Sequence, residues 1–149
     1  MQVMPEALVA ATGTVLAFDF GIKRIGVAVG ESMIGLAHPL AEISSEESEP
    51  RFATIALVVD EWKPQHLVVG LPLAADGTEH ELTRRAKRFA RQLEGRFSLP
   101  VSLVDERYSS VEAEAGLRQT GARRALREKR VDSAAAQVIL QQYFHDHAA

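Results

Sequence analysis

The pattern of hydrophobic and polar positions divides the chain into short apolar runs separated by polar segments and by longer amphipathic ones. Five runs rich in strand-forming residues are bounded by turn-forming residues. The strands they predict span residues 14–20, 25–30, 35–43, 66–70 and 101–104. The first two flank a four-residue turn and predict a β-hairpin, while Pro39 indicates that the third strand lies at a sheet edge.

Apolar residues at helical spacing predict helices between and after the later strands. These helices are expected at residues 51–62, 78–97 and 109–119, with a last one beginning near 132. Thr78 with Glu81, and Ser109 with Glu112, have the spacing of a capping box at a helix start. Loops are expected at residues 44–50, 72–77 and 120–130.

This order of elements predicts an α/β fold. Strands joined through helices run parallel and lie beside the hairpin, which makes a five-stranded mixed sheet with flanking helices. The chain has 149 residues, a length typical of one domain. We expect a flexible N-terminal tail over residues 1–13 and a single domain over residues 14–149.

Composition narrows the possible chemistry. The chain has no cysteine, which excludes disulfides, thiolate catalysis and cysteine-ligated zinc, and is consistent with a reducing compartment. The first residues carry no Lys or Arg and do not form a secretory signal. No apolar run approaches the roughly 18 residues of a membrane span. No membrane partner is therefore expected.

Charge is unevenly distributed, although the formal net charge is only −3. One basic group contains Arg118, Arg123, Arg124, Arg127, Lys129 and Arg130. A second contains Arg84, Arg85, Lys87, Arg88, Arg91 and Arg96. A bipolar surface of this kind can hold a polyanion on one side. The alternative is that both groups are solvated faces.

Two acids lie where strands end. Asp19 lies inside an apolar strand, where a charge is costly unless it is offset, so it is either a metal ligand or a cap for the turn at Gly21. Glu106 follows the last strand, at the sheet edge where α/β proteins bind ligands. Strand alternation sends Asp105 to the opposite face. The alternative for Glu106 is an ion pair with Arg107.

A third acid and a basic turn have similar alternatives. Asp132 precedes a run of alanines, and it is either an N-cap or a site residue on a helix that crosses the sheet near Asp19. Lys23 and Arg24 in the turn after Asp19 could hold a phosphate or could simply be solvated.

Four motifs together resemble one family. They are residues 18–30 (FDFGIKRIGVAVG), 68–79 (VVGLPLAADGTE), 104–112 (VDERYSSVE) and 131–140 (VDSAAAQVIL). In this order they resemble the YqgF, or RuvX, family of Holliday-junction-resolvase-like proteins, over almost the whole chain from Thr14 to Phe144. The resemblance implies a ribonuclease-H-like fold with sheet order 3-2-1-4-5. It also implies a cytoplasmic nuclease, a hydrolase of ester bonds that processes the 5′ end of precursor 16S ribosomal RNA in ribosome biogenesis.

The acids that match the family are Asp19, Glu106 and Asp132, which the resemblance implies to be both catalytic and metal-binding. Hard Mg²⁺ or Mn²⁺, as two ions, suits a set of carboxylates. Phosphate contacts are expected from Lys23, Arg24, Arg107, Arg123, Arg124, Arg127, Lys129 and Arg130. The expected partner is nucleic acid, structured RNA rather than branched DNA, and with it pre-ribosomal particles.

Two features depart from the related proteins. Ile22 stands where the family commonly has threonine, so a hydroxyl contact is lost. Junction resolvases take their second carboxylate from the strand beside the first, which here ends in Gly70-Leu71-Pro72. Glu106 must reach across two strand spacings, about 9.6 Å. We therefore expect the two carboxylates to be linked through metal and not to touch directly.

Three alternatives to an RNA nuclease stay open. One is a DNA endonuclease of the Holliday-junction type. Another is a non-catalytic RNA- or ribosome-binding module, which the missing neighbouring-strand carboxylate favours. The third is a phosphotransferase of the actin and sugar-kinase type, which shares the Asp-x-Gly hairpin but needs two such domains around a nucleotide.

Overall fold

A computed structural model describes residues 13–106 and 124–147, with 124–133 described by their backbone alone. It confirms the predicted α/β architecture, a five-stranded sheet in the order β3-β2-β1-β4-β5. The strands are β1 (Thr14–Phe20), β2 (Ile25–Glu31), β3 (Leu36–Ile43), β4 (His66–Leu71) and β5 (Val101–Asp105). The first three are antiparallel, whereas β4 runs parallel to both β1 and β5. β3 lies at the edge, as Pro39 predicted.

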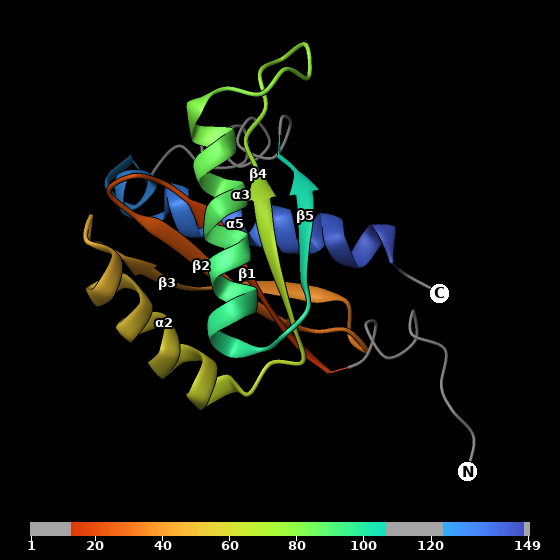
Figure 1. Cartoon of the computed structure of the whole chain (residues 1–149). Helices are drawn as coiled ribbons and strands as arrows, with labels where there is room; N and C mark the ends of the chain where they lie inside the picture. The colour runs from red at the N-terminus through yellow and green to blue at the C-terminus, as the bar shows by residue number, and fades with distance from the viewer. Residues whose placement is uncertain (1–12, 107–123, 148–149) are drawn as a thin grey trace.

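Helices cover both faces of the sheet. α2 (Ser48–Trp62) and α3 (Glu81–Phe97) lie on one face, and α5 (Arg124–Asp146) crosses the other (Figure 1). No helix among the described residues is both long and apolar enough to cross a membrane.

The face beneath α2 and α3 is filled with large side chains. Leu16 and Phe18 of β1 point to this side, where they join a core that also contains Phe52, Phe89 and Leu93. The ring centroid of Phe89 lies 5.9 Å from that of Phe18 and 5.7 Å from that of Phe52. Aromatic pairs at these separations add to the burial of apolar area.

The face beneath α5 is built from smaller strand residues. Val15, Ala17, Ala28 and Val68 meet a helix that contributes Ala136, Ile139, Leu140, Tyr143 and Phe144. The helix is also tied to the edge strand. Gln137 Nε2 donates to the Ala37 carbonyl at 3.0 Å, and Gln141 Oε1 accepts from the Ala37 N–H at 3.1 Å. These bonds fix how α5 lies over the sheet.

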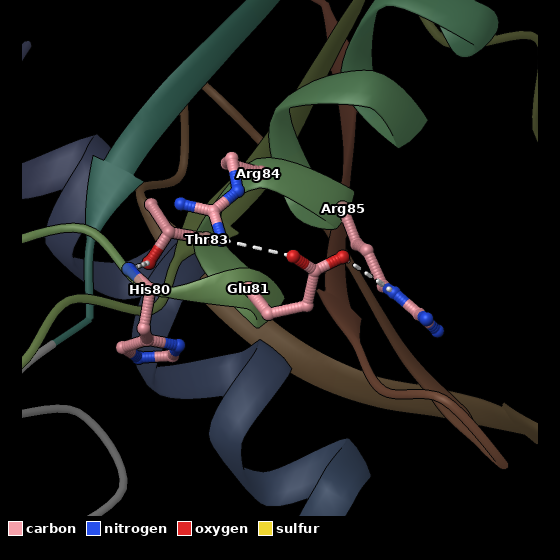
Figure 2. Close-up of polar contacts among 5 residues, drawn as sticks. All are labelled: His80, Glu81, Thr83, Arg84 and Arg85. Atoms are coloured by element: carbon pink, nitrogen blue, oxygen red, sulfur yellow. Dashed lines mark hydrogen bonds and ion pairs between the residues drawn. The ribbon is translucent and has the colours of Figure 1, made fainter.

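The start of α3 differs from the prediction. The helix begins at Glu81, and the capping box expected from Thr78 is wrong. Asp76 Oδ1 accepts from the Thr78 N–H at 2.9 Å and from its hydroxyl at 2.7 Å, so Thr78 belongs to a turn. The Thr83 hydroxyl instead accepts from the His80 N–H at 3.1 Å and caps the helix (Figure 2).

The other two described helices begin earlier than predicted, whereas α3 begins later. α5 begins at Arg124, so the loop expected over 120–130 is wrong from residue 124 onward. Strong helix formers such as Leu126 and Glu128 follow that start, and neither Gly nor Pro occurs after Gly121. α2 begins at Ser48 because Pro50 is tolerated in a first turn. The predicted helix over 109–119 and the tail up to residue 12 lie outside the described residues.

Candidate active site

Asp19 lies near the carboxyl end of β1, half-buried on the face covered by α5. Strand alternation places it on the same side as Val15 and Ala17, which pack in the α5-side core. Its partner in β2 is Gly26. In β4, Gly70 follows Val69, the partner of Phe18. Asp19 therefore has a glycine beside it in each flanking strand, and neither neighbour occupies the space around its carboxylate.

Glu106 reaches this carboxylate from the far side of β4. Its N–H donates to the Leu71 carbonyl at 3.2 Å, which extends the β4–β5 pairing by one residue. The Glu106 side chain hydrogen-bonds with that of Asp19. The expectation that the two carboxylates do not touch directly is therefore wrong. Asp105 is exposed and, by strand alternation, points to the opposite face from Glu106, as predicted.

Gly70 explains how the gap is crossed. A Cβ built on Gly70 would lie 2.4 Å from Glu106 Oε2 and 2.4 Å from Ile139 Cδ1. The Glu106 carboxylate and the α5 side chain thus lie in the space that a β4 side chain would occupy. Two strand spacings measure the distance between backbones, and they overestimated the separation of the carboxylates because the Glu106 side chain lies over Gly70.

The environment of Glu106 disfavours a negative charge. Burial raises the pKa of the Glu106 carboxyl, the hydrogen bond with Asp19 lowers it in part, and the nearby charge of Asp105 raises it again. Among the described residues, Glu106 Oε2 is a buried acceptor with no hydrogen-bond partner. Two neighbouring carboxyls with an unused acceptor form a site that fits a hard divalent cation.

The third predicted acid, Asp132, lies inside α5. The helix starts at Arg124, so position 132 falls in its third turn and the N-cap interpretation is wrong. Its side chain is outside the described part of the structure. Across the described side chains, no three His, Asp or Glu residues gather closely enough to hold a metal ion. Two of the three predicted acids are thus together, and the role of the third stays a prediction.

The turn after Asp19 carries the first two predicted phosphate contacts. Lys23 is exposed, whereas Arg24 Nε lies 3.6 Å from Glu42 Oε1 in an ion pair. Ile22, in place of the family's threonine, is 51% exposed and contributes no polar atom. The phosphate roles of Lys23 and Arg24 stay predictions.

Arg51 is a residue of the site that the sequence did not reveal. It is only 7% exposed, and its Nη2 donates to the Gly21 carbonyl at 2.6 Å and also to that of Ile22. Its Nε donates to the carbonyl of Ser45. Burial lowers the pKa of Arg51, and the charge of Glu46 raises it in part. Arg51 therefore holds the turn beside Asp19, although an arginine in the first turn of an amphipathic helix looks like a solvated one.

The remaining predicted phosphate contacts cannot be placed by their side chains. Arg107 and Arg123 lie outside the described residues. The others have only their backbone described, within α5: Arg124, Arg127, Lys129 and Arg130.

Comparison with known sequences gives one consistent family. Residues 13–146 match the family described as "RuvX: Holliday junction resolvase". A protein of Methylobacillus flagellatus is 54% identical over 95% of this chain and 97% of its own length. Another, from Nitrosomonas europaea, is 52% identical over 98% of this chain and 99% of its own. Both bear the name "Putative pre-16S rRNA nuclease".

Comparison with solved structures shows the fold. The Fowlpox virus resolvase, solved with Holliday junction DNA, has a TM-score of 0.59 at 12% identity and covers 91% of this chain and 99% of its own. Thermus thermophilus RuvC, solved with a Holliday junction substrate, has a TM-score of 0.55 at 18% identity, covering 90% of this chain and 94% of its own. The sheet order and these neighbours together confirm the ribonuclease-H-like fold.

Proposed function

The chain belongs to the RuvX family, and from that premise we propose that it is a nuclease that hydrolyses phosphodiester bonds at the site formed by Asp19 and Glu106. The observation that carries the proposal is the contact between these two carboxyls across Gly70. Natural proteins rarely bury an acid with an unused acceptor atom unless the site has a function. A purely structural strand end would gain nothing from this arrangement.

We propose that Asp19, Glu106 and Asp132 hold Mg²⁺ or Mn²⁺, as two ions. The backbone of α5 supports the third ligand, because position 132 precedes Ile139 by two helical turns on the same stripe as buried Ala135 and Ala136. Ile139 itself covers Gly70 beside Glu106. When bound, such ions lower the pKa of an attacking water and stabilise the leaving oxygen.

The chain's own residues position the reacting groups. Arg51 holds the Gly21–Ile22 turn and thereby the end of β1 on which Asp19 stands. Ile139 and the neighbouring core exclude water from one side of Glu106. Basic residues around the site would bind the phosphates that flank the cleaved bond; they are Lys23, Arg24, Arg107, Arg123, Arg124, Arg127, Lys129 and Arg130.

The proposed substrate is the precursor of 16S ribosomal RNA at its 5′ end, acted on in the cytoplasm within pre-ribosomal particles. The names of the two bacterial relatives support RNA of this kind. The description of the family supports branched DNA as a second candidate. Both substrates therefore belong in the test.

The deciding experiment measures cleavage of labelled precursor RNA and four-way DNA junctions with Mg²⁺ or Mn²⁺. Asp19→Asn should lower kcat by roughly 10²–10³-fold or more, the scale on which one lost catalytic electrostatic group acts. Its circular dichroism spectrum should stay that of the folded protein. Asp60→Asn, at an exposed position of α2, removes an equal charge and should cleave normally.

Three outcomes separate the hypotheses. Metal-dependent cleavage that survives in Asp19→Asn would overturn the role of Asp19. RNA binding without turnover in the wild type would support the non-catalytic module. Cleavage of junctions alone would assign the site to branched DNA.

A further inference from the structure

A groove lies on the face of the sheet opposite the two carboxylates. It encloses about 610 Å³ between the first turns of α2 and the length of α3, and we name it the α2–α3 groove. Its lining includes five arginines and two glutamates. The arginines are Arg51, Arg84, Arg85, Arg88 and Arg91. The groove is therefore basic, although the chain as a whole is slightly acidic.

Two of these arginines have no acidic partner among the described side chains. Glu81 Oε2 accepts from Arg84 at 2.9 Å and its Oε1 from Arg85 at 3.3 Å, and Figure 2 shows Glu81 reaching both from the first turn of α3. Arg88 and Arg91 are exposed on the following turns. Neither has an ion pair or hydrogen bond among the described residues. They present free positive charge at the spacing of adjacent turns.

The floor of the groove is aromatic. Phe20, Phe52 and Phe89 line it, and the ring centroids of Phe20 and Phe89 lie 5.0 Å apart. Phe20 is half-buried, so part of its surface faces the groove. Single-stranded nucleic acids bind where basic walls follow the backbone and aromatic rings receive bases.

The groove begins at the strand that carries the candidate active site. Phe20 directly follows Asp19 in β1, and alternation sends the two side chains to opposite faces. Arg51 lines the groove and also holds the turn that joins the two faces. A nucleic-acid strand with one phosphate at Asp19 therefore reaches the groove by passing around the carboxyl end of β1.

We propose that the α2–α3 groove binds the phosphodiester backbone of a single-stranded segment flanking the cleaved bond, with Arg88 and Arg91 contacting successive phosphates. The proposal rests on the nuclease function and identifies a second part of its substrate site. A second copy of the chain fits less well, because a twofold contact through this groove would bring the same arginines against each other.

The first test measures binding without cleavage. A fluorescent single-stranded RNA is titrated in EDTA at several salt concentrations with the double variant Arg88→Gln/Arg91→Gln. Its affinity should fall about tenfold, and the salt slope should flatten by about 1.4, since each lost single-strand phosphate contact contributes about 0.7. The control Lys63→Gln/Lys87→Gln removes the same charge from residues outside the groove and should keep both values.

The second test locates the bound strand. The chain has no cysteine, so Gln92→Cys places a single photo-crosslinker in the groove and Lys63→Cys places one outside it. The same RNA should cross-link to position 92 and not to position 63. Polyglutamate of equal charge concentration should not prevent the cross-link. Displacement by polyglutamate would overturn the proposal in favour of an acidic polypeptide, and dimer formation through position 92 would do so in favour of a second copy.

Cleavage then separates this proposal from the nuclease function. For a long RNA, Arg88→Gln/Arg91→Gln should raise KM while kcat stays near the wild-type value, because the groove lies on the face away from the carboxylates. If the wild type cleaves and the double variant binds and cleaves like the control, the groove proposal is wrong and the nuclease stands. If the wild type cleaves nothing but the variant still loses affinity and salt slope, the nuclease is wrong and the groove stands.

Discussion

The two faces of the sheet differ in the size of the side chains that the strands contribute to them. Toward α2 and α3, the strands and helices supply large residues such as Phe18 and Phe89. Toward α5, the strands supply valine and alanine, and glycine near the carboxyl end of β4. We call the face toward α2 and α3, which is lined by large strand side chains, the thick face. We call the face toward α5, which is lined by small ones, the thin face.

This difference separates stability from chemistry. The α2–α3 face buries a cluster of large aromatic and aliphatic side chains, and removing their apolar area from water stabilises the fold. On the α5 face, the absence of a side chain at Gly70 leaves space that Glu106 uses to reach Asp19. Burying the Glu106 carboxyl is unfavourable for folding and lowers the stability contributed by the thin face. The apolar core of the thick face offsets this loss.

The largest effect is expected from Phe89→Ala on the thick face. Phe89 contacts Phe18, Phe20 and Phe52, and its loss should lower the free energy of unfolding by about 3–5 kcal/mol. Phe144→Ala is the matched change on the α5 face, where Tyr143 is the one aromatic neighbour of the ring among the described residues. Phe144→Ala should lower the free energy of unfolding by less than Phe89→Ala does, as measured by urea denaturation followed by circular dichroism. An equal or greater loss for Phe144→Ala would contradict the comparison.

A smaller loss of stability but a larger loss of activity is expected from Gly70→Ala on the thin face. The new methyl group would lie 2.4 Å from both Glu106 Oε2 and Ile139 Cδ1, which should cost about 1–3 kcal/mol. Displacing the Glu106 carboxylate should lower kcat by roughly 10²-fold. Gly95→Ala, in α3 with no atom within 4 Å of the added carbon, should stabilise the protein by up to about 1 kcal/mol and leave cleavage intact. Normal cleavage by Gly70→Ala would show that Glu106 does not need this space.

The smallest effect is a pH dependence from His66 on the α5 face. His66 is 5% exposed, its Nε2 lies 2.7 Å from Ser102 Oγ, and its ring stacks on Tyr143. Burial lowers the pKa of His66, as does the charge of His147. The folded state thus takes up a proton less readily than the unfolded state.

Stability from neutral His66 is therefore complete above the ordinary histidine pKa of about 6.5 and is lost as pH falls below it. The melting temperature should fall between about pH 8 and about pH 5.5, and His66→Gln should reduce that fall. His38→Gln, at an exposed position, is the control and should leave the pH dependence unchanged. A His66→Gln profile that coincides with the wild-type profile would remove His66 as its cause.

Local sequence determined most of the fold. Apolar runs of strand-forming residues predicted all five strands within one or two residues of their observed bounds, because each run is short and bounded by polar or turn-forming residues. Helix starts were less well predicted. Thr78 has the spacing of a cap, but its bonds to Asp76 place it in a turn. Arg124 starts a helix because nothing in residues 124–131 interrupts one.

The sequence alone determined the elements, their order and the presence of an acid at the ends of β1 and β5, because these depend on local periodicity and on rules of chain connection. Only the tertiary structure decided that Glu106 crosses β4 to meet Asp19 and that Arg51 holds the turn beside them. Both contacts join residues distant in sequence, and they depend on space that a neighbouring strand or helix leaves free. Such space is a property of packing, which no single segment of the chain encodes.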